Sequence, residues 1–294
     1  MKYTDLHCDT LYELYKKNLS YQNDRLHLRS DFENIFEAHT QVFAIWTQNN
    51  LCPDDAWKQF HAILNHAKTA QIPQNIRSIL AVEGGNLLGN DLSRLDTLYA
   101  LGVRFLTLVW GGDSCLGGAH DTNEGLNAFG QSALFRCLEL GIHPDVSHAS
   151  DKMFWQVAEA CNARNLPILA THSNARAVCN HSRNLNDEMF LEIVKSGGVA
   201  GISMAALHVK EDANATIEDV LRHIDHYFSL GGEDSVCLGC DFDGISRAPK
   251  GIENMYDLPR LADRLAASGY SDCQIHKIFH QNADNFLNGI LGGR

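Results

Sequence analysis

The chain has 294 residues, of which 45% are hydrophobic and 20% charged, as is ordinary for a globular protein. A formal net charge of −12 argues against a nucleic-acid partner, because phosphate binding needs a basic face. Nine cysteines without a disulfide framework suggest a reducing compartment, and with no signal peptide or long apolar run we expect a cytoplasmic protein without a membrane segment.

Short apolar runs alternate with helical patterns along the chain, and no linker, repeat or low-complexity segment divides it. The runs are mostly β-branched or otherwise apolar and end in polar or glycine residues, which is typical of buried strands. Strands are predicted at Tyr3–His7, Val42–Thr47, Ser78–Glu83, Phe105–Trp110, Ile142–His148, Ile168–His172, Val199–Met204 and Val236–Asp241.

Helical periodicity fills most of the intervals between these strands and the stretch after the last one. Eight strands alternating with helices predict an α/β fold, a (β/α)8 TIM-like barrel formed by a single domain over residues 1–294. The rival is an open doubly wound sheet, but the first turn, His7-Cys8-Asp9-Thr10, lacks the glycines of its phosphate-binding motif. Helices are predicted at Asp54–Thr69, Leu92–Leu101, Ser132–Leu140, Asp151–Arg164, Asp187–Lys195, Ile217–Leu230, Leu258–Ala267 and Ser271–Leu287.

Side chains of the kinds that bind metal ions close five of the predicted strands. In a barrel the C-terminal strand ends meet at one mouth, so these scattered residues are expected to converge. A lone histidine or glutamate in such a place is more often structural, and only the joint pattern points to a metal site. The six candidate ligands are His7, Asp9, Glu83, His148, His172 and Asp241.

The spacing of His7 and Asp9 has a physical reason, because alternate residues of a strand point to the same side. Three imidazoles and three carboxylates suit zinc, with manganese, cobalt or iron as alternatives. Six ligands are too many for one tetrahedral ion with an open position, but they suffice for two divalent ions if one carboxylate bridges them. Two such ions can activate one water molecule and polarise the bond under attack.

Other histidines are weaker candidates. His223 and His226 lack the glutamate of a zinc-binding helix motif, and we expect them to lie on a solvated helical face. His120 lies in a glycine-rich loop from which it could touch a substrate. No nucleophile elbow and no Walker lysine are present, which favours a metal-activated nucleophile.

In these ligand positions and in several longer blocks, the sequence resembles the membrane (renal) dipeptidases and their bacterial relatives in the amidohydrolase superfamily. The matching blocks span nearly the whole chain in order. They are Asp5-Leu6-His7-Cys8-Asp9-Thr10, Ala81 to Gly85, Gly102 to Leu108, Gly125 to Gly130, His172 to Cys179 with Arg183-Asn184-Leu185, and Gly239 to Gly244.

The resemblance implies a barrel with two zinc ions, one held by His7, Asp9 and Asp241 and the other by His148 and His172. Glu83 would bridge the two ions. Arg183 matches the arginine that grips a substrate carboxylate through a two-pronged hydrogen bond. The implied reaction is hydrolysis of a dipeptide by a hydroxide that bridges the metals, with Asp241 carrying a proton to the leaving amine.

Two departures from the family pattern affect the predicted substrate pocket. Trp110 stands where the family often has a histidine that helps to bind the carbonyl oxygen, and Ala205 stands where it often has a tyrosine. Losing one such donor can lower the rate about 10²- to 10³-fold, so another group would have to replace it. We therefore assign Trp110 to the substrate pocket and leave the identity of the dipeptide open.

Three hypotheses follow for the function. The leading one is a metal-dependent dipeptidase for dipeptides with a free C-terminal carboxylate, where a D-residue at the second position is one option because the family tends to accept it. The second is another amidohydrolase acting on a cyclic or small amide or a lactam. The third is a metal-binding protein without catalysis. A homodimer is compatible with the resemblance.

Overall fold

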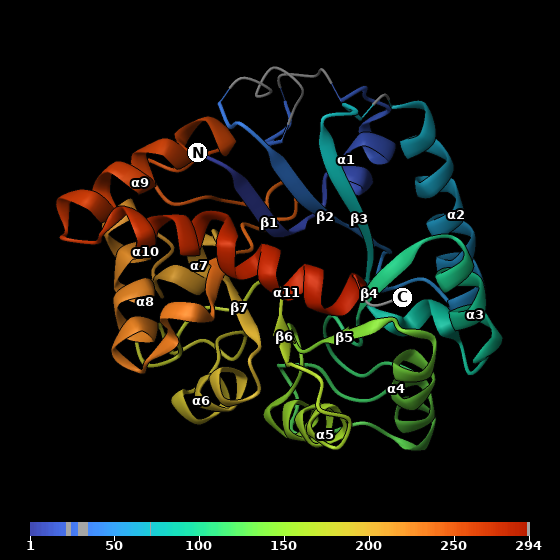
Figure 1. Cartoon of the computed structure of the whole chain (residues 1–294). Helices are drawn as coiled ribbons and strands as arrows, with labels where there is room; N and C mark the ends of the chain where they lie inside the picture. Colours follow the sequence, from blue (N-terminus) through green and yellow to red (C-terminus); the bar gives the residue numbers. More distant parts are fainter. Residues whose placement is uncertain (22–24, 29–34, 71, 293–294) are drawn as a thin grey trace.

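Eight parallel strands close into a barrel, each paired with its neighbours in chain order (Figure 1). The computed structural model describes residues 1–21, 25–28, 35–70 and 72–292. This closed barrel with interleaved helices confirms the predicted (β/α)8 fold. The strands are β1 (Tyr3–Cys8), β2 (His39–Trp46), β3 (Ile76–Glu83), β4 (Val103–Thr107), β5 (His143–Asp145), β6 (Leu169–Ala170), β7 (Val199–Ile202) and β8 (Val236–Leu238).

Helices follow the strands and surround the barrel (Figure 1). Two of the predicted helices, Asp187–Lys195 and Leu258–Ala267, have the predicted bounds, whereas the predicted helix Ser271–Leu287 contains a π-helical turn that divides it. The helices are α1 (Thr10–Lys17), α2 (Pro53–Thr69), α3 (Ser93–Ala100), α4 (Ala128–Leu140), α5 (Asp151–Asn162), α6 (Asp187–Lys195), α7 (Ala206–Val209), α8 (Ile217–Ser229), α9 (Leu258–Ala267), α10 (Asp272–His276), the π-helical turn η5 (Lys277–Gln281) and α11 (Asn282–Leu291).

Helix α11 crosses the strands at the N-terminal end of the barrel (Figure 1). Its Ala283, Phe286 and Leu287 pack against a buried cluster inside the barrel, and the Thr4 hydroxyl near the start of β1 donates to Asp284 at 2.7 Å. This apolar packing closes one end of the barrel, so the C-terminal strand ends are left to form a site. The inward-facing cluster consists of Leu6, Val42, Ala44, Ile79, Ala81, Phe105, Leu169, Val199 and Cys237.

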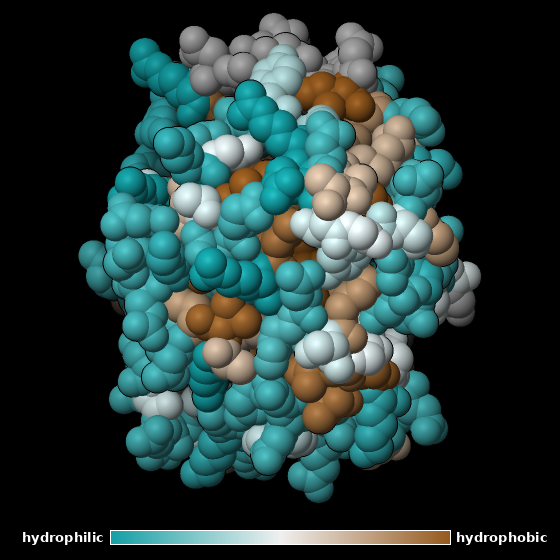
Figure 2. Space-filling model, turned by 90° about the vertical axis from the view of Figure 1, so that its left-hand side faces the viewer, coloured by the Kyte–Doolittle hydropathy of each residue, from teal (hydrophilic) through white to brown (hydrophobic). Residues whose placement is uncertain are grey.

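The outer surface is largely hydrophilic on the face that carries α8, α9 and α10, with hydrophobic residues in small groups (Figure 2). Large exposed hydrophobic side chains on other helices include Phe135 on α4, Trp155 on α5 and Leu191 on α6. Among the described residues, no helix combines the length and the apolar character that a membrane crossing requires.

Six strands end earlier than predicted: β2 at Trp46, β4 at Thr107 and β7 at Ile202, in addition to β5, β6 and β8. Strands β5, β6 and β8 stop at Asp145, Ala170 and Leu238, so the residues that follow them lie in loops at the mouth of the barrel. The predicted bounds Ile142–His148, Ile168–His172 and Val236–Asp241 were therefore too long at their C-terminal ends. Val146 follows the last residue of β5 and Cys240 lies two residues after the end of β8, so hydropathy alone does not reveal where the pairing ceases.

Candidate metal centre and substrate pocket

The structure brings all six predicted ligands together at the C-terminal mouth of the barrel. One oxygen of Glu83, Oε1, lies 3.5 Å from His7 Nε2, 2.9 Å from His148 Nε2 and 3.4 Å from His172 Nε2. All six side chains are buried, so water solvates their charges poorly. Glu83, the last residue of β3, therefore occupies the centre of the cluster.

The ligands form two groups. In the first ligand group, His7 Nε2 lies 3.5 Å from Asp9 Oδ2 and 4.0 Å from Asp241 Oδ1. In the second ligand group, Glu83 joins His148 and His172, whose Nε2 atoms are 3.1 Å apart. Within each group the ligand atoms lie within 4.8 Å of one another, a spacing that a shared cation can bridge. Glu83 is also within 3.5 Å of His7, so it contacts both groups.

Backbone geometry places His7 toward this mouth. The pairing of β1 with β2 shifts between Asp5 and Cys8, so two residues of β1 face one residue of β2. Leu6 consequently packs inside the barrel while the next residue, His7, also faces the site. A register shift of this kind re-aims a side chain next to an active site.

The second ligand group consists of hydrogen-bond acceptors that face one another. His148 Nδ1 donates to the Trp110 carbonyl at 2.6 Å, and His172 Nδ1 donates to the Thr171 hydroxyl at 2.8 Å. Burial holds the pKa of both imidazoles well below the usual value, so both rings are neutral and their Nε2 atoms carry lone pairs. Two such nitrogens against a carboxylate oxygen need a cation between them.

The first ligand group contains more carboxylate charge than its one imidazole can balance. Burial raises the pKa of Asp9 to about 6 and holds that of Asp241 well above its ordinary value. Burial by itself lowers the pKa of His7, but the neighbouring carboxylates outweigh it and raise that pKa to about 10. Among the described residues, no hydrogen-bond partner meets His7 Nε2 or Asp9 Oδ1, although both atoms are buried.

These observations fit a divalent metal. Unpartnered buried atoms, facing lone pairs and an excess of carboxylate are each relieved by a cation with nitrogen and oxygen ligands. The hydrogen bonds from both Nδ1 atoms fix the tautomer that metal-binding histidines use. Among the described residues there is one further group of possible ligands, in which Asp145 joins His7 and His172. It shares both histidines with this site.

Two of the six ligands adopt a left-handed backbone conformation, with φ of 67° at His148 and 61° at Asp241. This conformation is uncommon for residues other than glycine, and it persists where surrounding contacts enforce it. The His148 carbonyl accepts from His120 N at 2.7 Å, and Asp241 N donates to the His7 carbonyl at 3.1 Å. The loops are thus held in the strained form that aims both side chains into the cluster.

Gly244 has no room for a side chain. A Cβ built there would lie 2.1 Å from Asp9 Oδ2 and 2.5 Å from Asp241 Oδ1. We expect Gly244→Ala to displace these two carboxylates and to weaken metal binding by the first ligand group about 10-fold or more. A metal titration monitored by calorimetry checks this. Gly111→Ala is the matched control, because a Cβ at Gly111 meets no atom within 4 Å. Equal affinity in both variants would contradict the expectation.

A cavity of about 590 Å³ opens over the cluster. Arg183 lines it, is buried, and has a pKa that burial lowers to about 10. Its Nη2 donates to the His172 carbonyl at 3.4 Å, but Nε and Nη1 meet no hydrogen-bond partner in the described part of the chain. A buried guanidinium with free donors is suited to an anionic group of a ligand.

The residues that depart from the family pattern line the same cavity. Trp110 is 37% exposed, and its ring lies 6.0 Å from the ring of His148. Ala205 and His120 also line the cavity, and His120 Nδ1 is 2.8 Å from the Ser182 hydroxyl. Ala205 contributes only a small side chain to the lining.

Sequence reasoning missed several residues at this mouth. His181, in a loop, and His208, in the short helix α7, line the cavity, and no sequence pattern indicated that these two segments meet. Asp145, the last residue of β5, lies beneath the cluster. Its position just before the Ser147-His148 turn was the one sequence feature that could have indicated this. His223, which we expected on a solvated face, is fully buried, and its ring bonds to Ala175 N and the Val209 carbonyl.

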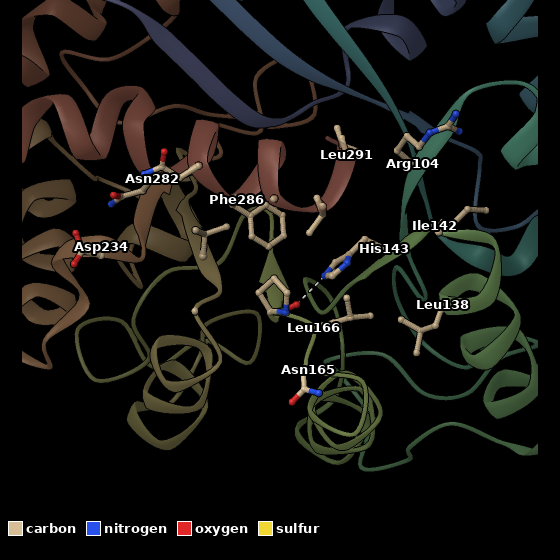
Figure 3. Close-up of a pocket in the computed structure, with 17 residues that line it drawn as sticks. Arg104, Leu138, Ile142, His143, Asn165, Leu166, Asp234, Asn282, Phe286 and Leu291 are labelled. Carbon is tan, nitrogen blue, oxygen red and sulfur yellow. Dashed lines mark hydrogen bonds between the residues drawn. The ribbon is translucent and has the colours of Figure 1, made fainter. Parts of the chain in front are cut away.

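A second cavity, of about 490 Å³, lies beside α11 at the other end of the barrel (Figure 3). His143 Nε2 donates to the Pro167 carbonyl at 2.8 Å, and Phe286 of α11 borders the space. Among the described residues, none of the possible ligand clusters lies here. The chemistry is therefore concentrated at the C-terminal mouth.

Known proteins are similar to this chain in sequence and in fold. The family model described as membrane dipeptidase, peptidase family M19, matches residues 54–287. Dipeptidase 3 of Macaca fascicularis is 30% identical over 75% of the chain, which spans 46% of that protein's own length. A crystal structure titled as the family M19 metallopeptidase dipeptidase AC has a TM-score of 0.91 at 28% identity, covering 100% of this chain and 99% of its own. A metallopeptidase from Rhodobacter sphaeroides, liganded with a phosphinate mimic of the dipeptide L-Ala-D-Ala, has a TM-score of 0.87 at 27% identity, covering 98% of this chain and 99% of its own.

Proposed function

The chain belongs to the membrane dipeptidase family of metallopeptidases, and from this premise we propose that it hydrolyses the peptide bond of dipeptides with a free C-terminal carboxylate. One observation carries the proposal. The buried, cation-deficient ligand cluster and the unpartnered donors of Arg183 face the same cavity of about 590 Å³. A carboxylate held by Arg183 would place the rest of a small substrate against the cluster.

We propose that the cluster holds two divalent ions, most simply zinc. His7, Asp9 and Asp241 would hold one ion, His148 and His172 the other, and Glu83 would bridge them. Bound divalent ions supply Lewis acidity, which lowers the pKa of water and polarises a carbonyl group. The oxygen of Glu83 that lies within 3.5 Å of all three imidazoles supports the bridging role.

The remaining roles belong to side chains of the same cavity. Asp241 would accept a proton at its carboxylate and pass it to the leaving amine. Arg183 would bind the substrate carboxylate and fix its register. Trp110 would form a wall of the pocket beside His148.

A similar solved structure suggests which stereochemistry the substrate has. The Rhodobacter sphaeroides structure contains a mimic of L-Ala-D-Ala, so we propose that a D-residue at the second position is accepted here too. The small side chain of Ala205 in the cavity lining favours acceptance of a larger second side chain. All residues proposed for these steps come from one chain, 1–294, which we propose acts as a single catalytic domain.

The experiment is a hydrolysis screen of dipeptides with L- and D-residues at the second position, with and without added zinc. Matched compounds are the same dipeptides with a C-terminal amide, together with cyclic dipeptides and lactams. We expect metal-dependent turnover of free dipeptides and much weaker turnover of the amides. Turnover confined to cyclic or amidated compounds would favour another amidohydrolase, and no turnover by fully metal-loaded protein would favour a binding role.

A further inference from the structure

Asp145, the last residue of β5, lies directly beneath the ligand cluster and accepts four hydrogen bonds. Its Oδ1 accepts from Ser147 N at 3.0 Å and Thr171 N at 2.9 Å. Its Oδ2 accepts from the Thr171 hydroxyl at 2.6 Å and the Thr107 hydroxyl at 2.7 Å. Asp145 is close enough to His7 and His172 to be considered a ligand itself. Its oxygens are already engaged by four donors, which favours a supporting role over coordination.

These contacts tie down the two loops that supply the histidines of the second ligand group. Ser147 directly precedes His148, and Thr171 directly precedes His172. The Thr171 hydroxyl donates to Asp145 and therefore receives the Nδ1 proton of His172. Asp145 thus sets both the position of the loops and the tautomer of one imidazole.

Asp5, in β1, repeats the arrangement under the first ligand group. Its Oδ1 accepts from His7 N and from Cys240 N, each at 3.0 Å, and its Oδ2 accepts from the Tyr3 hydroxyl. Cys240 directly precedes Asp241. Each of the two buried carboxylates accepts a hydrogen bond from the backbone N–H two residues later in the chain. Each also accepts one from a backbone N–H in the loop that follows a neighbouring strand, and that loop carries a ligand, Asp241 or His172.

We propose that Asp5 and Asp145 are positioning residues that each set the affinity of one metal site, Asp5 that of the first ligand group and Asp145 that of the second. The proposal rests on the two-ion centre of the proposed function. It adds that the two halves of the centre are supported separately, because within the described part of the chain no hydrogen bond links the partners of Asp5 to the partners of Asp145.

The test is a titration of metal-free protein with Co²⁺, read by visible absorption and calorimetry, which resolves two binding steps. Two reference variants, His172→Ala and Asp9→Ala, identify which step belongs to which group. We expect Asp145→Asn to weaken only the step that His172→Ala removes, by about 10- to 100-fold. We expect Asp5→Asn to weaken only the step that Asp9→Ala removes.

A threonine pair provides a finer comparison if the aspartate variants fold poorly. Thr107→Val and Thr171→Val each remove one hydroxyl donor from Asp145 Oδ2, but only Thr171 also receives the Nδ1 proton of His172. We expect Thr171→Val to weaken the second-group step and Thr107→Val to leave it near the wild-type value. A merely structural role for Asp145 predicts the same small effect in both.

The outcomes separate the two levels of the account. If the wild-type protein binds two ions but each aspartate variant weakens both steps equally, the separate support proposed here is overturned and the two-ion centre stands. The same holds if the two threonine variants cannot be distinguished. Wild-type protein that takes up a single ion would overturn the two-ion centre and this inference together.

Discussion

Glu83→Gln is expected to abolish peptide hydrolysis, with kcat falling about 10³-fold or more, equivalent to about 4 kcal/mol of transition-state stabilisation. Glu83 Oε1 is the only atom of the cluster placed within 3.5 Å of His7, His148 and His172 among the described contacts. Glutamine keeps the shape of the side chain but removes the charge and one acceptor. Metal content measured by mass spectrometry should fall below two equivalents per chain.

The control for Glu83→Gln is the same substitution at an exposed site. Glu139→Gln removes a carboxylate that pairs with Arg136 on the surface of α4, where an ion pair contributes little. Circular dichroism of both variants in metal-free buffer verifies that the barrel remains folded. Glu83→Gln with two tightly bound ions and undiminished kcat would remove Glu83 from the proposed bridging position.

Arg183→Met is expected to lower kcat/KM for free dipeptides about 100-fold, equivalent to about 3 kcal/mol, mainly by raising KM. The guanidinium is buried and has two unpartnered nitrogens, so its loss would leave the substrate carboxylate without a charged partner. Turnover of the matching C-terminal amides should change far less. Comparing the two substrate series in one variant isolates recognition of the carboxylate.

Arg183→Lys is the matched variant for that comparison. Lysine keeps the charge but cannot form the two parallel hydrogen bonds of a guanidinium, so we expect intermediate activity. Metal content should stay at the wild-type level in both variants, because Arg183 donates to the His172 carbonyl and not to a ligand atom. Equal losses for dipeptides and their amides would show that Arg183 does not read the carboxylate.

The barrel was predictable because its signals are local and repeated. Each strand is a short apolar run, and the alternation with helices has one common closed solution at eight strands. Glu83 was located well because β3 ends at that residue, as predicted. His148 and Asp241 were expected at strand ends but lie in loops with positive φ, a feature that hydropathy does not encode.

Other features depend on contacts between distant segments. His223 appeared as a polar residue on an amphipathic helix, yet its buried ring joins Ala175 N to the Val209 carbonyl. The supporting role of Asp145 depends on Thr107 and Thr171, which are 38 and 26 residues away. Sequence periodicity places a residue on a face, but it does not specify which distant donor meets it.

The pocket wall is where this chain departs from the pattern that its sequence resembles. Trp110 lies beside His148 with its carbonyl engaged by that imidazole, so the backbone at this position contributes to the cluster whatever the side chain does. Ala205 lines the same cavity with a small side chain. The ligand side chains and the side chains of Trp110 and Ala205 thus come from separate segments, which allows the ligands to be retained while the wall side chains vary.

We propose that the six buried ligands form one centre for two metal ions and that this centre hydrolyses dipeptides. The most direct test is to add Zn²⁺ in steps to metal-free protein while measuring bound zinc per chain and dipeptide turnover in the same samples. We predict binding of two equivalents per chain, with full activity only when both are bound. Saturation at one equivalent or less, or full activity before the second ion binds, would contradict the account.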